Sequence, residues 1–94
     1  MITIYNKRLG IAPPDMEILD MNIADYSWFN AKPTVVFCIR LYNDAITEIN
    51  MASSNVFELI IDDIRYQYED ILENPDFFRN AIEKEKIGKL LEKL

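Results

Sequence analysis

Histidine is absent from this chain of 94 residues, and glycine and cysteine are rare, at two and one. Without histidine, a Ser-His-Asp or Cys-His catalytic group cannot form, and the commonest neutral metal ligand is missing. Two glycines, Gly10 and Gly88, are too few for a glycine-rich phosphate loop. We therefore expect no enzyme activity, no cofactor and no bound metal. The sequence carries no motif specific enough to indicate a family.

The single cysteine, Cys38, cannot close a disulfide within the chain, so the fold does not depend on oxidation. No apolar run approaches the ~18 residues that a membrane-spanning helix needs. The basic residues Lys7 and Arg8 follow only a few apolar ones, which does not resemble a secretory signal peptide. These absences predict a soluble cytoplasmic protein. The length and the half of the residues that are apolar predict one domain over residues 1–94.

Charge is unevenly distributed along the chain, whose formal net charge is −6. Between Leu9 and Asp76, thirteen acids stand against three bases, whereas from Phe77 onward five bases stand against three acids. Nucleic-acid phosphates and anionic lipids repel a protein of this sign, so we expect no direct binding to nucleic acid and no membrane binding. The partner that fits this charge is another protein with a basic surface.

Alternating apolar residues predict four strands. A short strand is expected over Met1–Tyr5, and a second over Glu17–Ile23, although apolar residues from Met16 to Tyr26 also fit a helix face. The clearest strand, Thr34–Tyr42, has one wholly apolar face and is expected at the centre of a sheet, with Cys38 as a buried core residue. Asn43-Asp44 predicts a turn, after which Ala45–Met51 returns as the partner strand.

An aromatic cluster occupies the connection between the second and third strands. A helical turn is expected to hold its members, which are Tyr26, Trp28 and Phe29. Such a cluster serves more often as ordinary core than as a stacking platform for a ligand. The acidic surroundings also argue against a nucleic-acid base as the ligand.

Two helices are expected in the second half of the chain. The first runs from an N-cap at Asn55 to Leu72, with Glu58 completing a capping box. Its apolar stripe consists of Val56, Phe57, Ile60, Ile61, Ile64, Tyr68, Ile71 and Leu72. The second begins at Pro75 and uses Phe77, Phe78, Ala81 and Ile82 as its apolar face. The predicted fold is α+β: a small, mainly antiparallel sheet of three or four short strands, covered by both helices.

The polar side of the first expected helix is the strongest functional indication in the sequence. Carboxylates gather there almost without basic compensation, although like charges four residues apart destabilise a helix by about 0.2–0.5 kcal/mol per pair. Two apolar residues, Leu59 and Tyr66, lie among these carboxylates. The predicted partner-binding residues are Glu58, Leu59, Asp62, Tyr66, Glu69, Asp70 and Glu73. A merely solvated acidic face is the alternative, and the sequence does not decide between the two.

A second apolar stripe closes the chain on nearly the opposite side of the last helix, and Gly88 lies where the stripe changes side. Its residues are Ile87, Leu90, Leu91 and Leu94. The helix either breaks near Gly88 or presents a second apolar face. That face could fold back onto the core, pair with a second copy in a homodimer, or dock on a different partner.

Two functional hypotheses follow from these patterns. The first is a small acidic protein-binding module that occludes a basic surface of its partner, as immunity proteins, antitoxins and phage-encoded inhibitors of host defence do. The alternative is a structural subunit that assembles into homo-oligomers through its C-terminal helix.

Overall fold

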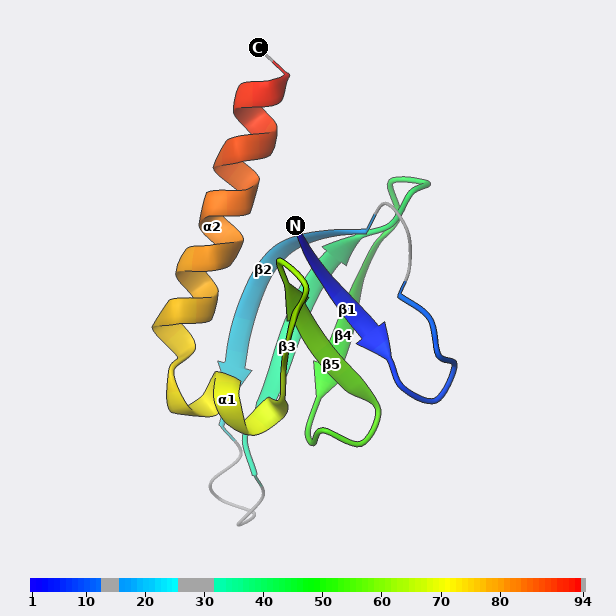
Figure 1. Ribbon diagram of the computed structural model, residues 1–94, viewed down its shortest axis with the longest axis vertical. Helices are drawn as coiled ribbons and strands as arrows, with labels where there is room; N and C mark the ends of the chain where they lie inside the picture. Colours follow the sequence, from blue (N-terminus) through cyan, green and yellow to red (C-terminus); the bar gives the residue numbers. More distant parts are fainter. Residues whose placement is uncertain (13–15, 26–31, 94) are drawn as a thin grey trace.

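The computed structural model describes residues 1–12, 16–25 and 32–93, and within them six strands form two antiparallel three-stranded sheets (Figure 1). Sheet A contains β1 (Ile2–Asn6), β5 (Phe57–Ile61) and β6 (Ile64–Tyr66), in the order β1-β5-β6. Sheet B contains β2 (Glu17–Ala24), β3 (Thr34–Arg40) and β4 (Ile46–Met51), in the order β2-β3-β4. Two helices follow, α1 (Tyr68–Glu73) and α2 (Pro75–Glu92). The α+β class with antiparallel strands is as expected, but two sheets replace the single one.

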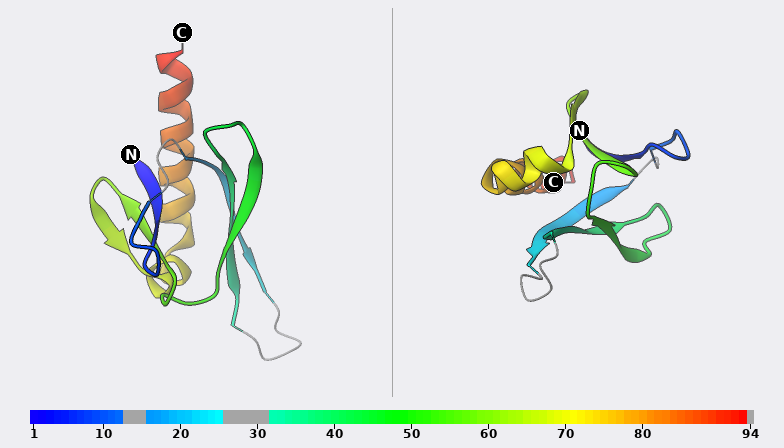
Figure 2. Two further views of the ribbon diagram at one scale, coloured as in Figure 1. Left: turned by 90° about the vertical axis from the view of Figure 1, so that its right-hand side faces the viewer. Right: turned by 90° about the horizontal axis from the view of Figure 1, so that it is seen from below.

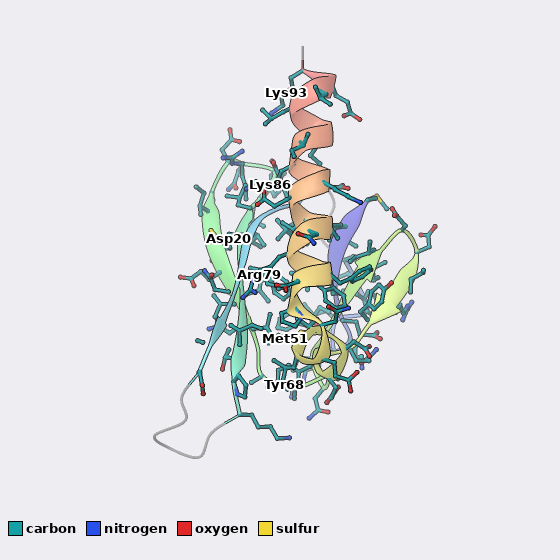
Figure 3. The ribbon with its side chains drawn as sticks, turned by 90° about the vertical axis from the view of Figure 1, so that its left-hand side faces the viewer. Asp20, Met51, Tyr68, Arg79, Lys86 and Lys93 are labelled. Atoms are coloured by element: carbon teal, nitrogen blue, oxygen red, sulfur yellow. The ribbon has the colours of Figure 1, made fainter. Side chains whose placement is uncertain are left out.

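The core lies between the two sheets, and α2 lies across one side of the opening between them (Figures 2 and 3). Each sheet turns one face inward, because successive side chains of a strand point to opposite faces. The buried apolar residues come from both sheets and both helices: Ile2, Ile4, Met16, Ile18, Met21, Val35, Phe37, Ile39, Met51, Leu59, Ile61, Tyr68, Ile71, Phe78 and Ile82. Neither three-stranded sheet could bury this set alone.

Sheet B follows the sequence prediction closely. The segment 17–24 is a strand, which excludes the alternative helix there. The third predicted strand is the central one, and its inward residues Val35, Phe37 and Ile39 are buried. The turn after it is longer than two residues, since the backbone N–H of Leu41 donates to the carbonyl of Ala45 at 2.9 Å. Asp44 holds a left-handed φ of 64° within that turn, a conformation that Asp tolerates.

The prediction that Cys38 is a buried core residue is wrong. Cys38 is partly exposed, because it lies on the face of β3 that alternates with the buried Phe37 and Ile39. Its cross-strand neighbours are Asp20 on β2 and Glu48 on β4. A strand at the centre of its sheet still has an outward face, and sheet B buries only one of its two faces.

The predicted long helix from Asn55 to Leu72 is also wrong, because most of this segment forms the β5–β6 hairpin and only 68–73 is helical. The two strands are joined by Asp62 and Asp63, whose φ angles of 49° and 70° are both left-handed. Two consecutive positive φ angles are the requirement of the tightest hairpin turns, and Asp accepts them better than most residues. Pairing with β1 then holds β5 in the sheet.

Helix α2 begins at Pro75 as predicted and continues without a break through Gly88. Its first half is packed on the core through Phe78 and Ile82. Its last turns project beyond both sheets (Figure 1), and Ile87, Leu90 and Leu91 are 54%, 64% and 64% exposed. The second apolar face is therefore real and does not fold back onto the core. Leu94 and the aromatic cluster of Tyr26, Trp28 and Phe29 lie outside the described residues.

Substitutions at Asp63 test the hairpin against a helix. In the left-handed turn, Asp63→Gly relieves Cβ strain and should raise the free energy of unfolding by about 0.5 kcal/mol, whereas Asp63→Ala should lower it by about 1 kcal/mol. Inside a helix the order reverses, with glycine about 1 kcal/mol worse than alanine. Urea denaturation followed by circular dichroism measures both variants. A more stable alanine variant would contradict the hairpin.

Candidate protein-binding site

The hairpin disperses the residues that a single helix face would have gathered. Glu58 and Leu59 are only 6% and 0% exposed, so their assignment to a partner-binding surface is wrong. Asp62 lies in the turn, where its carboxylate accepts a hydrogen bond from the amino group of Met1 at 2.7 Å. Three predicted residues, Tyr66, Asp70 and Glu73, do come together around one concavity.

This concavity, called here the aromatic hollow, lies where β6, α1 and the start of α2 meet. Its volume is about 400 Å³, and its lining consists of Arg65, Tyr66, Asp70, Glu73, Asn74, Phe77 and Phe78. The aromatic side chains come from β6 and α2, and the carboxylates come from α1. Hydrophobic and negatively charged groups therefore share one open depression.

Three aromatic rings form a mutually supporting cluster in the hollow. Phe78 is buried and lies edge-on to both Tyr66 and Phe77, with ring centroids 5.0 Å apart in each pair. Tyr66 and Phe77 are 6.0 Å apart. Edge-to-face pairs of this kind contribute about 0.5–1.5 kcal/mol beyond their buried area. Phe78 thus fixes the two outer rings, and Phe77 remains 46% exposed to solvent.

Helix α1 is short, and a distant hydroxyl fixes its first turn. Ser54, in the loop before β5, accepts the backbone N–H of Tyr68 at 2.9 Å and donates to the carboxylate of Glu69 at 2.8 Å. The carboxylate of Asp70 accepts the backbone N–H of Gln67 at 2.8 Å. Because a six-residue helix has little stability alone, these caps position Asp70 and Glu73 at the hollow.

The pKa of Glu69 is lowered from its usual value of 4.5, and the Ser54 hydroxyl hydrogen bond is the largest cause. The backbone N–H of Glu69 and the attraction of Lys32 and Lys7 lower this pKa further. A lowered folded-state pKa means that the charged carboxylate favours the folded state above pH 4.5. That contribution is lost as the pH falls through the lowered pKa.

The one cation at the rim, Arg65, is held by groups outside the hollow. Its guanidinium lies over the ring of Tyr5, 4.9 Å from the centroid, and pairs with Glu58 at 3.4 Å. The side-chain amide of Gln67 also donates to Glu58. This explains why Glu58 can be buried: a buried charge needs a partner and hydrogen bonds. The ion pair with Glu58 also neutralises Arg65, the cation that lines the hollow.

A second concavity, the α2 groove, runs between α2 and the β1–β5 side of sheet A. Its volume is about 550 Å³, and its apolar lining consists of Ile2, Ile61, Phe77 and Ala81. Lys84 and Lys89 line it together with Asp62, Glu85 and Glu92, so its walls carry both signs of charge. Phe77 belongs to both concavities. The aromatic hollow is the more uniformly acidic of the two, because the basic residue that lines it, Arg65, is already paired with Glu58.

Within residues 1–12, 16–25 and 32–93, no group of three or more cysteine or carboxylate side chains comes close enough to hold a metal ion. No helix in the same residues is long and apolar enough to cross a membrane. Compared with protein-family models, with curated proteins and with solved structures, the chain has no match.

The sequence pattern places Phe77 with Phe78 on the apolar face of the helix and does not indicate its part in this site. One signal was available. Adjacent residues of a helix point about 100° apart, so two neighbouring phenylalanines cannot both be centred on one buried face. The structure buries Phe78 and leaves Phe77 beside the carboxylates of α1.

Removing the Ser54 hydroxyl should loosen α1. Ser54→Ala is expected to lower the free energy of unfolding by about 1 kcal/mol, the usual effect of losing a helix cap, and to raise the pKa of Glu69 toward 4.5. Urea denaturation and an NMR titration of the Glu69 carboxyl group measure the two effects. The matched control is Ser53→Ala, whose hydroxyl accepts only a longer bond of 3.3 Å from Asn55. Equal effects of both substitutions would show that the Ser54 hydroxyl does not stabilise the first turn of α1.

Proposed function

We propose that this protein is a small acidic protein-binding module, which takes an arginine or lysine side chain of a basic partner into the aromatic hollow. The observation that carries this proposal is the exposed ring of Phe77 beside Tyr66, with Asp70 and Glu73 at the rim. An aromatic face and a carboxylate attract the same kind of group. A cation over an exposed ring gains about 0.5–1 kcal/mol, and more where water is excluded.

The charge of the whole chain supports the same partner. With a net charge of −6, the protein attracts basic surfaces at long range, which mainly speeds association. Short-range affinity then comes from a few anchors, and tyrosine and other aromatic residues are frequent anchors at protein interfaces. The hollow supplies the anchor and the acidic surface supplies the steering.

Occlusion of a basic surface is the biochemical role that we propose for this binding. Immunity proteins, antitoxins and phage-encoded inhibitors of host defence have this role in common: each covers a functional surface of another protein. Such surfaces are basic wherever the target acts on nucleic acid, because phosphate binding requires lysine and arginine.

A second candidate function is homo-oligomeric assembly through α2. The observation in its favour is the exposure of Ile87, Leu90 and Leu91 on the projecting end of the helix. Apolar side chains at helical spacing that cover no core are typical of an interface.

A pair of small probes tests the hollow without knowledge of the natural partner. N-acetyl-arginine amide should bind with a dissociation constant of about 10 mM, since one exposed cation–ring contact and one exposed ion pair contribute little. N-acetyl-citrulline amide has nearly the same shape without the charge and should bind more weakly. NMR shift changes should be largest at the ring protons of Tyr66, Phe77 and Phe78.

Three variants give this test its controls. Glu73→Gln should weaken arginine binding about threefold, the effect of losing an exposed ion pair, and Phe77→Ala should abolish it. Asp44→Asn removes one negative charge from a turn outside the hollow and should leave binding unchanged. Shift changes of equal size for both probes, or shifts spread over all acidic surfaces, would count against the hollow as the binding site.

A further inference from the structure

The last ten described residues, 84–93, comprise the end of α2 and its C-cap Lys93, and we call this segment the α2 tail. Its last turns extend beyond both sheets (Figures 1 and 2), and it carries three apolar side chains, Ile87, Leu90 and Leu91, each more than half exposed. The tail therefore has apolar surface that the described part of the chain does not cover.

The charge of the tail is opposite to that of the body. Four lysines stand against two glutamates between residues 84 and 93. Arg79, Lys86 and Lys93 follow one another along α2 at seven-residue spacing (Figure 3), which keeps them nearly in line with a drift of only about 20° per seven residues. At about 100° per residue, this line borders one side of the apolar residues and Lys84 borders the other. Cations therefore flank the apolar surface on both sides.

This flanking charge disfavours a symmetric pairing of two tails. In an antiparallel pair each flank faces the same flank of the other helix, so Lys86 and Lys93 would meet their own copies. In a parallel pair their line would face the flank of Lys84. The nearest acid on this side, Glu83, already pairs with Lys86 at 3.3 Å within the helix. Like charges placed opposite one another cost stability in either arrangement.

The surface that complements the tail lies on the same chain, at the opposite end of the molecule. The aromatic hollow is near the start of α2, whereas the tail is at its end (Figure 1). Its rings fit an apolar side chain, and Asp70 and Glu73 fit the flanking lysines. The two surfaces are too far apart on one straight helix to meet within a single chain. They can meet between two chains.

We propose that the α2 tail of one copy docks into the aromatic hollow of a second copy, so that the chains associate head to tail. This inference rests on the proposed function, because it names the basic ligand of the hollow. A lysine of the tail enters the hollow beside Phe77 and approaches Asp70 and Glu73, and an apolar residue of the tail packs against Tyr66. Each copy then keeps one free hollow or one free tail, and such a heterologous contact continues into an open chain or closes into a ring.

Sedimentation velocity over a range of protein concentrations tests this contact. At low salt the average mass should rise with concentration, and 0.5 M NaCl should lower the association constant at least tenfold, because salt screens exposed charges. The tail variant Leu90→Gln with Leu91→Gln and the hollow variant Glu73→Lys with Phe77→Ala should each remain monomeric. All four positions are solvent-exposed, and circular dichroism with urea denaturation checks that both variants fold.

Mixing the two variants gives the decisive result. The tail variant keeps an intact hollow and the hollow variant keeps an intact tail, so the mixture should form a 1:1 dimer that does not grow further. A hollow variant that self-associates as well as the original protein would show a symmetric tail pairing and overturn the proposal. A chain that stays monomeric at low salt, or a mixture without a dimer, would overturn it as well. In those cases the binding of N-acetyl-arginine amide to the tail variant still tests the proposed function separately.

Discussion

Five backbone pairs join β1 to β5, from Ile2 opposite Ile61 to Asn6 opposite Phe57. This pairing brings together segments more than fifty residues apart and holds 57–61 in an extended conformation. The hairpin that follows then places Tyr66 on β6, at the edge of sheet A opposite β1, and the chain returns to the core through α1. The position of α2, and with it the aromatic hollow, depends on these strand contacts.

The same pairing marks the limit of what the sequence could predict. The strands of sheet B and the start of α2 were predictable because local signals decide them: alternation in 34–40, the Asn43-Asp44 turn and the proline at position 75. In 56–72 the apolar residues fit a helix stripe as well as two short strands. Only the long-range partner β1 decides between them, and a local pattern contains no information about that partner.

The candidate site was predictable in part for the same reason. Tyr66, Asp70 and Glu73 were identified as one surface, and they remain neighbours although the helix that was expected to join them does not exist. Leu59 was lost from that surface because a strand turns alternate residues inward, and Glu58, on the opposite face, because it is covered by its ion pair with Arg65. Phe77 entered the site from α2, whose position relative to the hairpin is a tertiary property.

The side chain of Phe77 lines both the aromatic hollow and the α2 groove. Its ring is 46% exposed, so a molecule that displaces it in one concavity changes the shape of the other. Two occupants that both move this ring are therefore coupled, one in the hollow and one in the groove. Thermodynamic linkage makes this coupling reciprocal. If a molecule in the groove changes the affinity of the hollow for its ligand, that ligand changes the affinity of the groove by the same factor.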